Sequence, residues 1–207
     1  MKTNTILWAI GIILILSACK KSSEPDITPL PDFMNLKVGN YWVYEYYKID
    51  SNGFETKLPK TDTSFIEKDT TINDITYYKW FRASVELKGQ KYPTFVRDSL
   101  GYLVTDWGAI LFSRDNFTDT LVFDTLPILT SILKMVGKDS IVQVSAGSFT
   151  TRTARLTVFP TDPHYPWGVR YFYNVYGANT GLILWSYALY SQPSYYEARL
   201  SSFHNAH

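Results

Sequence analysis

Apolar and polar residues alternate along much of the chain, which predicts a protein built mainly from β-strands. The pattern is clearest from Ile75 to Leu87, where alternate residues, with Lys79 as the exception, are apolar. These apolar positions are Ile75, Tyr77, Phe81, Ala83, Val85 and Leu87, and the opposite face carries Thr76, Arg82, Ser84 and Glu86. A period of two is typical of a strand with one buried face, so this run is predicted to be a half-buried strand.

Two other runs, 41–49 and 182–190, carry aromatic or aliphatic residues on both faces. Neither set of side chains is polar enough to be fully solvated, so both faces of these strands need cover. The cover is either a second layer of structure or the far wall of a cavity.

Turn-forming residues separate the predicted strands. They are Ser51-Asn52-Gly53, Lys88-Gly89-Gln90, Asp98-Ser99-Leu100-Gly101, Ala146-Gly147 and Asn179-Thr180-Gly181. Gly and Asn adopt a positive φ at little cost, as tight turns require. The spacing of these turns predicts consecutive antiparallel hairpins.

One segment departs from the period of two. Its apolar residues recur at helical intervals between Pro127 and Gly137, and they are Ile128, Leu129, Ile132, Leu133, Met135 and Val136. Proline at the start and glycine at the end are typical of a helix. We therefore predict one short helix over 128–136, with an extended hydrophobic loop as the alternative. Such a helix would plug one side of a curved sheet or pack as ordinary core.

Composition and charge support the β prediction and narrow the partners. Tyr and Phe, with 16 and 12 copies, occur beside many Val, Ile and Thr residues, and all of these fit a pleated, half-buried surface. The net charge is +1, so no basic excess attracts nucleic acid, and no nucleic-acid partner is expected.

Residues 1–18 have the three parts of an export signal. Lys2 supplies a positive charge, Ile6 to Leu16 form an apolar run, and the small residues Ser17 and Ala18 follow. A membrane-spanning helix needs roughly 20 apolar residues, and this run is shorter. It is therefore predicted to be a removable signal peptide.

The end of this signal, Leu16-Ser17-Ala18-Cys19, resembles the lipobox of bacterial lipoproteins. The resemblance implies cleavage before Cys19 and acyl chains on that residue. Two or more acyl chains anchor a protein stably, so a membrane is the expected partner at Cys19. The alternative is a free or buried thiol. Because Cys19 is the only cysteine, no internal disulfide is expected.

The mature chain is predicted to consist of a tether and one domain. Residues 19–31 form the tether, because Lys20 to Pro31 are polar and include three prolines. Residues 32–207 are long enough for a single β domain with a hydrophobic core. Lys20 and Lys21 do not match an aspartate-type inner-membrane retention signal, so the outer membrane is the expected location.

Three short motifs in the mature chain resemble those of uncharacterised envelope lipoproteins. The first, Leu36 to Tyr44, has the form Leu-x-x-Gly-x-x-Trp-x-Tyr, and the others are Ala146-Gly147-Ser148-Phe149 and Asn179-Thr180-Gly181-Leu182-Ile183. The resemblance implies a curved antiparallel sheet, either a half-barrel or a lipocalin-like sheet. The concave face of such a sheet can hold an apolar ligand, and the resemblance brings no catalytic residues.

Three non-catalytic functions are consistent with this pattern: a carrier of an apolar ligand, an envelope interaction module and a glycan-binding surface protein. A carrier of an apolar small molecule would have an internal cavity lined by residues such as Trp42, Tyr44, Phe172 and Trp185; the alternative for Trp42 is a core position. A glycan-binding surface protein would instead expose aromatic rings at Trp107, Tyr165 and Trp167. The last two lie in the proline-rich loop Pro160 to Gly168, where their rings either face solvent or fold back on the core.

No catalytic motif supports an enzyme. The sequence has no nucleophile elbow, no phosphate-binding glycine loop and no His-Glu-x-x-His zinc motif. A hydrolase with carboxylates from separate strands is the remaining enzymatic alternative. Asp162 and His164 are two potential metal ligands, fewer than a site normally needs, so neither a metal nor a cofactor is expected.

A short pattern of Asp followed by Ser or Thr occurs five times. It resembles the O-glycosylation acceptor of some Gram-negative envelopes and would place modified residues at Thr70, Ser99, Thr120, Thr125 and Ser140. The alternative is structural, because Asp, Ser and Thr side chains also form local turns where strands begin.

Overall fold

The computed structural model describes residues 30–84, 91–189 and 191–206. The predicted signal peptide, Cys19, all but the last two residues of the tether and the turn Lys88-Gly89-Gln90 fall outside these residues. The compact unit that carries the fold begins at Pro31.

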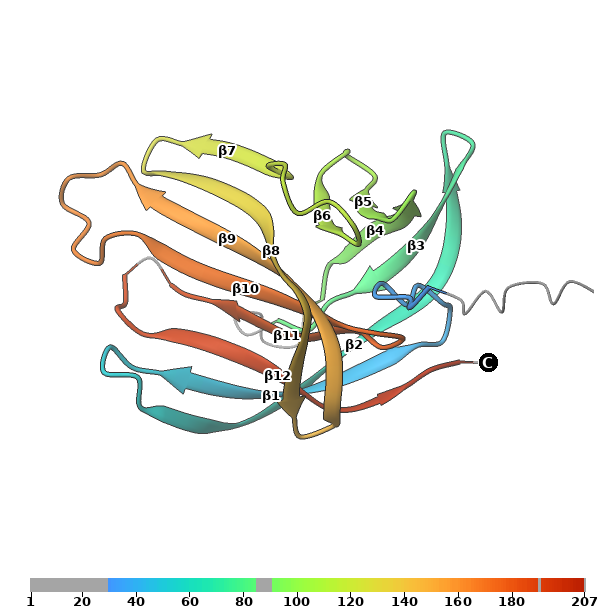
Figure 1. Ribbon diagram of the computed structural model, residues 1–207, viewed down its shortest axis with the longest axis horizontal. Helices are drawn as coiled ribbons and strands as arrows, with labels where there is room; N and C mark the ends of the chain where they lie inside the picture. Colours follow the sequence, from blue (N-terminus) through green and yellow to red (C-terminus); the bar gives the residue numbers. More distant parts are fainter. Residues whose placement is uncertain (1–29, 85–90, 190, 207) are drawn as a thin grey trace, which may run out of the picture. The chain divides into compact units, whose positions relative to one another are not determined.

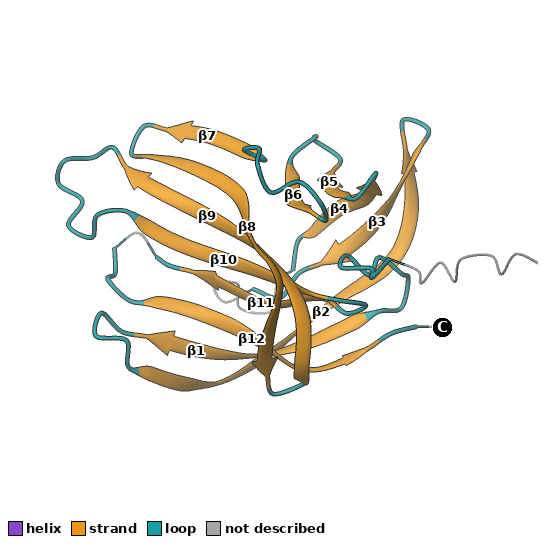
Figure 2. Ribbon diagram, in the orientation of Figure 1, coloured by secondary structure: helices purple, strands orange, loops and turns teal. Residues whose placement is uncertain are grey.

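Twelve strands and no helix occur within the described residues (Figures 1 and 2). The strands are β1 (Tyr41–Ile49), β2 (Glu55–Ile72), β3 (Ile75–Phe81), β4 (Pro93–Ser99), β5 (Tyr102–Thr105), β6 (Ile110–Ser113), β7 (Val122–Leu126), β8 (Leu129–Val144), β9 (Gly147–Pro160), β10 (Arg170–Gly177), β11 (Gly181–Tyr187) and β12 (Tyr195–His204). In this part of the chain, no helix is long and apolar enough to cross a membrane.

The strands form one antiparallel sheet in the order β6-β5-β4-β3-β2-β1-β12-β11-β10-β9-β8-β7. Strands that are neighbours in the chain pair as hairpins, except β6 and β7, which form the two edges of the sheet. Strand β1 pairs with β12 and joins the two halves. The sheet curves until β6 reaches strands near its other edge. The Ser113 amide donates to Met135 Sδ of β8 at 3.5 Å, and the rings of Phe112 and Tyr176 of β10 lie 4.2 Å apart. The predicted curved antiparallel sheet is confirmed.

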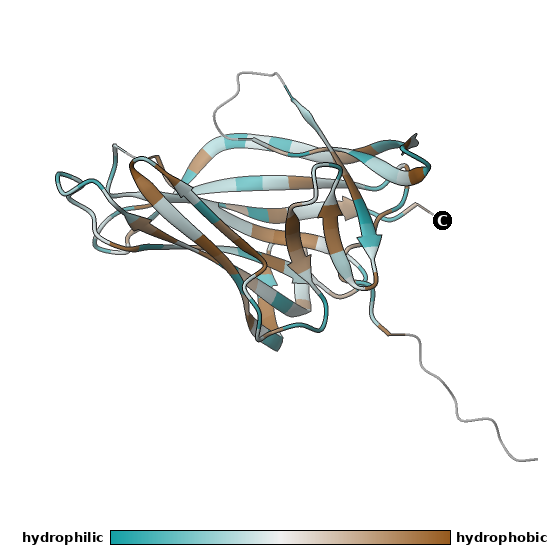
Figure 3. Ribbon diagram, turned by 90° about the horizontal axis from the view of Figure 1, so that it is seen from above, coloured by the Kyte–Doolittle hydropathy of each residue, from teal (hydrophilic) through white to brown (hydrophobic). Residues whose placement is uncertain are grey.

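The inner face of the sheet holds the hydrophobic core. On β1 the side chains of Trp42, Tyr44 and Tyr46 point inward and are at most 2% exposed. The outward Tyr47 is covered by Arg199, whose guanidinium carbon lies 4.3 Å from the ring centre. Both faces of this strand are therefore covered, inside by the curved sheet and outside by a long side chain. Figure 3 shows hydrophobic and hydrophilic bands alternating along the strands.

The half-buried strand predicted over 75–87 is shorter than expected, and its predicted buried face is buried only in part: Tyr77 and Ala83 are 6% and 7% exposed, whereas Ile75 is 41% exposed. Strand β3 ends at Phe81. Trp80 points into the core beside its Cα partner Ile66, whereas Phe81 stacks on Phe65 on the outer face at 4.9 Å. Aromatic residues occupy both faces of this strand, so hydrophobicity alone does not identify the inner one.

The predicted helix over 128–136 is wrong, because this segment is the first half of β8. Pro127 and Ile128 form the two-residue turn that joins β7 to β8, and Gly137 lies at a register shift opposite Thr153 of β9. Proline and glycine therefore mark a hairpin turn and a β-bulge here. Within β8, Leu133 and Met135 are buried with the strand period of two, and β7 and β9 pair with its two edges.

Four of the five predicted turns lie within the described residues, and each of them joins consecutive strands, as predicted. They lie between β1 and β2, β4 and β5, β8 and β9, and β10 and β11. Gly53, Gly101, Gly147, Asn179 and Gly181 adopt positive φ there. The β2–β3 turn, where Asn73 and Asp74 have φ of 49° and 61°, was not predicted.

Candidate functional site

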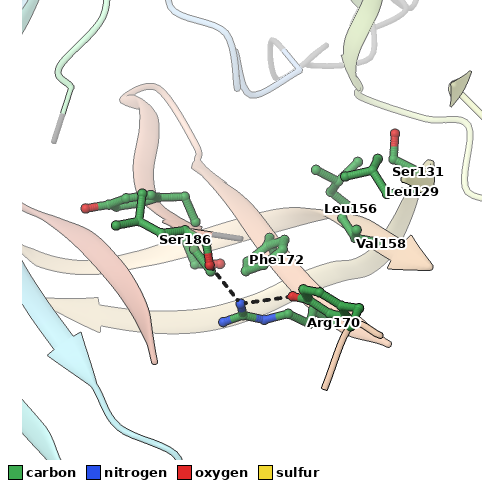
Figure 4. A pocket seen from close by; sticks show the side chains of 11 residues that line it. Leu129, Ser131, Leu156, Val158, Arg170, Phe172 and Ser186 are labelled. Atoms are coloured by element: carbon green, nitrogen blue, oxygen red, sulfur yellow. Dashed lines mark hydrogen bonds between the residues drawn. The ribbon is translucent and has the colours of Figure 1, made fainter. Parts of the chain in front are cut away.

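A hollow of about 310 Å³ lies on the inner face of the sheet, between β8, β9, β10 and the residues that follow β11. This volume is at the lower end of the roughly 300–1,000 Å³ that is typical of small-molecule sites. Its lining is mainly aliphatic and aromatic: Leu129, Ser131, Leu156, Val158, Tyr165, Arg170, Phe172, Ser186, Tyr187, Ala188 and Leu189 (Figure 4). We call this hollow the concave pocket.

The strand period of two brings the apolar residues of the concave pocket together. Val158 is the Cα partner of Ser131, and Leu156 is the partner of both the buried Leu133 and Phe172. Partners across an antiparallel ladder point to the same face. Leu156, Val158 and Phe172 therefore form one continuous apolar wall.

The sheet is split beside this pocket. Strands β10 and β11 pair only from Asn174 and Trp185 towards the turn at Gly181, whereas the first residues of β10 pair with β9 alone. At the point of separation, the Tyr173 amide donates to Ser186 Oγ at 2.7 Å, in place of a backbone acceptor. We call this separation the seam between β10 and β11.

Arg170 closes one end of the concave pocket. Its guanidinium nitrogens donate to the carbonyl oxygens of Leu189, Gln192, Pro193 and Ser194 at 2.9–3.3 Å, and Nη1 lies 3.4 Å from the Tyr165 hydroxyl. No carboxylate of the described residues lies within 4.0 Å of Arg170. The arginine thus fixes the segment after β11 over the seam and supplies a polar point in an otherwise apolar wall.

The four residues predicted to line a ligand cavity occupy three different places. Phe172 lines the concave pocket. Trp185 lies behind that lining, with its ring 5.3 Å from Tyr187. Trp42 and Tyr44 are buried in the core, where Trp42 Nε1 donates to the Thr180 carbonyl at 2.6 Å and the Tyr44 hydroxyl donates to the Leu182 carbonyl at 2.7 Å.

Three buried tyrosines of the inner face, Tyr44, Tyr46 and Tyr176, are neutral. Burial raises the pKa of Tyr176 to about 12, although nearby Arg82 acts in the opposite direction. Burial also raises the pKa of Tyr44 and of Tyr46. Because burial disfavours the charged phenolate, these side chains add no negative charge to the interior at neutral pH.

A second hollow, of about 400 Å³, lies on the outer face beside the same seam. It is lined by Trp167, Val169, Arg170, Tyr171, Phe172, Tyr173, Pro193, Tyr195 and Glu197. We call it the convex groove. Arg170 and Phe172 line both hollows, so the two lie on opposite sides of one thin wall.

The structure does not bring the three predicted surface aromatics into one hollow. Trp167 lines the convex groove, whereas Tyr165 lines the concave pocket. Trp107 lies in the turn between β5 and β6, is 67% exposed and lines neither hollow.

The five predicted glycosylation positions differ in accessibility. Thr120, Thr125 and Ser140 are exposed, and Thr70 and Ser99 are half-buried. Two of the preceding aspartates form local turn contacts. Asp98 accepts from the Gly101 amide at 2.8 Å, and Asp119 accepts from Asn116 Nδ2 at 2.7 Å.

Charged side chains form several ion pairs outside the two hollows. Lys57 donates to Glu45 and lowers the pKa of that carboxyl, and Arg114 and Arg152 do the same for Asp115. Across the described residues, no group of three His, Cys, Asp or Glu side chains is placed to hold a metal ion. Asp162 Oδ1 accepts from the His164 backbone amide at 2.9 Å.

Sequence reasoning missed most residues of both hollows. A usable pattern was present in β10, where Arg170 to Gly177 places Tyr171 and Tyr173 on one face and Phe172 and Tyr176 on the other. Aromatic residues on both faces indicate two covered or ligand-contacting surfaces. No sequence pattern identifies Arg170 as a site residue, because its partners are backbone carbonyls of the segment after β11.

No protein-family model matches the chain, and no curated protein is significantly similar to it. Among solved structures, a candidate lipoprotein from Parabacteroides distasonis superposes with a TM-score of 0.53 and 10% identity, covering 86% of this chain and 100% of that one. A candidate exported protein with a YmcC-like fold from Bacteroides fragilis gives a TM-score of 0.48 and 11% identity over 84% of this chain and 100% of that one. The chain therefore shares its fold with the Parabacteroides protein.

Proposed function

We propose that this chain is a non-catalytic, lipid-anchored protein of the bacterial cell envelope, located at the outer membrane, and that its concave pocket holds an apolar ligand. The lipobox-like Leu16-Ser17-Ala18-Cys19 supports the anchor. The description of the Parabacteroides protein as a candidate lipoprotein is consistent with it.

The concave pocket is the observation that carries the ligand proposal. Its walls are apolar, its volume is about 310 Å³, and Arg170 and the hydroxyls of Ser131 and Tyr165 supply a few polar groups. Known ligand sites combine an apolar lining with a small number of fixed polar groups. The pocket therefore suits a small apolar molecule or part of an acyl chain with one polar end.

Filling the concave pocket should weaken ligand binding. Val158→Trp places a larger ring in the pocket and is expected to weaken binding of the neutral apolar dye N-phenylnaphthylamine by about tenfold or more, because the ring occupies the ligand's volume. Dye fluorescence during titration of the protein measures the effect.

The neighbouring Phe159 gives a matched control. It lies on the same strand, points outward and is 38% exposed, so Phe159→Trp should bind the dye as the parent does. A parent protein that does not bind the dye, or a Val158→Trp variant that binds it equally well, would contradict the carrier proposal.

The anchor has a separate test. When parent and Cys19→Ala proteins are expressed in a Gram-negative host, the mature N-terminal peptide of the parent should carry the mass of its acyl chains. The variant should carry none, and the parent should sediment with outer-membrane fractions. Mass spectrometry that finds no acyl increment on Cys19 in the parent would refute the anchor without affecting the pocket.

A further inference from the structure

The convex groove differs in chemistry from the concave pocket on the other side of the seam. Tyr171, Tyr173 and Trp167 line it and are 51%, 39% and 38% exposed. Covering several exposed aromatic rings that gather in one hollow is favourable, because it removes apolar surface from water. Single exposed rings, by contrast, are common on protein surfaces. The groove therefore has the composition of a contact surface.

Walls from two strands define the groove. Tyr171 and Tyr173 stand on the outer face of β10, two residues and so about 7 Å apart. Tyr195 and Glu197 stand on β12, on the other side of β11. The β11 residue between these walls is Ser186, which is the Cα partner of Glu197 and bonds the Tyr173 amide. The hollow between the two walls is a trough lined by residues of both strands, whereas Ser186 lines the concave pocket.

The polar groups of the trough are held in place and carry charges of both signs. Glu197 Oε2 accepts from Arg199 Nε at 2.8 Å and from Arg199 Nη2 at 2.6 Å. Burial is the main cause of a raised pKa at Tyr195, and nearby Glu197 raises it further. The Tyr195 hydroxyl is therefore neutral and can donate a hydrogen bond. With Arg170 and Glu197 both in the lining, no field of one sign selects an anionic polymer.

We propose that the convex groove binds a neutral oligosaccharide. The negative faces of aromatic rings attract the C–H groups of a pyranose, and fixed carboxylate and phenol groups hydrogen-bond its hydroxyls. A purely apolar ligand would cover the Tyr195 hydroxyl without giving it a hydrogen-bond partner, at a cost in binding free energy. Several rings in one trough provide contacts for at least two sugar units. This proposal does not rest on the ligand proposed for the concave pocket.

Titration calorimetry with cellohexaose, maltohexaose and chitohexaose tests the proposal. At least one of these sugars should bind the parent protein. Tyr171→Ala and Tyr173→Ala should each weaken that binding about tenfold, as expected for loss of one stacking ring. Phe123→Ala is the matched control, because Phe123 is an aromatic on the outer side of β7, 66% exposed and outside the groove. It should change the affinity less than twofold.

Binding of the apolar dye separates loss of the sugar site from loss of the fold. Each tyrosine variant should still bind the dye in the concave pocket. Should a tyrosine variant fail to fold, Trp167→Ala tests the same groove from an exposed loop outside the strands. Absence of binding by all three sugars, or sugar binding that none of the groove substitutions weakens, would overturn the proposal.

Discussion

Replacing Trp42 with alanine is expected to lower the free energy of unfolding by about 4 kcal/mol. Loss of a large, fully buried aromatic removes its apolar contacts and leaves a cavity, and such changes typically cost about 3–5 kcal/mol. Trp42 is 2% exposed, packs edge-on against Trp80 at 6.4 Å and donates to the Thr180 carbonyl. Urea denaturation followed by circular dichroism measures the change.

Trp107 provides the control for Trp42. It is also a tryptophan, but it is 67% exposed in a turn, so Trp107→Ala should change the unfolding free energy by about 0.5 kcal/mol or less. If the Trp42 and Trp107 variants were equally stable, Trp42 would not hold the core position that the structure assigns to it.

The position of Trp42 also explains two of the sequence motifs. The segment Leu36 to Tyr44 and the segment Asn179 to Ile183 are far apart in the chain, yet Trp42 and Tyr44 donate to carbonyls of the second segment. Gly181 has a φ of 94°, and a Cβ there would lie 3.3 Å from Trp42 Cζ2. Both motifs therefore serve one packing contact and do not line the concave pocket.

Replacing Arg152 with alanine is expected to lower the free energy of unfolding by about 2 kcal/mol. Its side chain is 11% exposed, donates to Asp115 at 2.8 Å and lies over the rings of Phe33 and Phe117 at 4.8 and 5.8 Å. Hydrogen bonds to charged groups contribute about 1.5–3 kcal/mol, and each cation–π contact roughly 0.5–1 kcal/mol. Because Asp115 is 62% exposed, solvent screening keeps the total near the lower end.

The stabilisation by the Arg152–Asp115 pair is expected to be larger at neutral pH than at acidic pH. Hydrogen bonds from Arg114 and then Arg152 lower the pKa of Asp115 in the folded protein. A lowered carboxyl pKa stabilises the fold above its unfolded value of about 4, and this stabilisation is lost as the pH falls through the folded value. The Arg152→Ala variant should thus differ more from the parent at pH 7 than at pH 2.

Lys57→Ala is the control for Arg152, because Lys57 pairs with Glu45 while its own side chain is 55% exposed. Exposed pairs of this kind contribute about 0–1 kcal/mol. Denaturation of both variants at the two pH values compares them. An Arg152→Ala variant no less stable than Lys57→Ala at pH 7 would show that Arg152 does not stabilise the contacts described.

Turns and strands, which depend on a few neighbouring residues, could be predicted from the sequence. The turns at Gly53, Gly101 and Gly181 follow from the need for positive φ, and the strands follow from aromatic and β-branched residues. The segment 128–136 was predicted wrongly because its apolar residues fit both periods. Pairing with β7 and β9, which the local sequence does not reveal, decided between them.

The candidate sites depend on strand pairing and on contacts between residues that are far apart in the chain. Phe172 was predicted to line an apolar cavity, but the seam beside it exists because the β10–β11 ladder stops at Asn174 and Trp185. Arg170 closes the pocket through carbonyls that lie 19 to 24 residues away in the chain. Residue type predicts neither feature. The end of the β10–β11 ladder depends on strand register, and the Arg170 contacts depend on backbone carbonyls, which every residue possesses.

The seam also determines how the two hollows influence each other. In a continuous sheet, neighbouring strands are locked by a ladder of backbone hydrogen bonds. Here the ladder between β10 and β11 stops at Asn174 and Trp185, and beyond that point the Ser186 bond and the Arg170 cluster hold the wall. Arg170 and Phe172 form part of both linings. If both hollows bind the ligands proposed for them, a molecule that orders this wall from one side is expected to change the free energy of binding on the other, and by thermodynamic linkage the effect is equal in both directions.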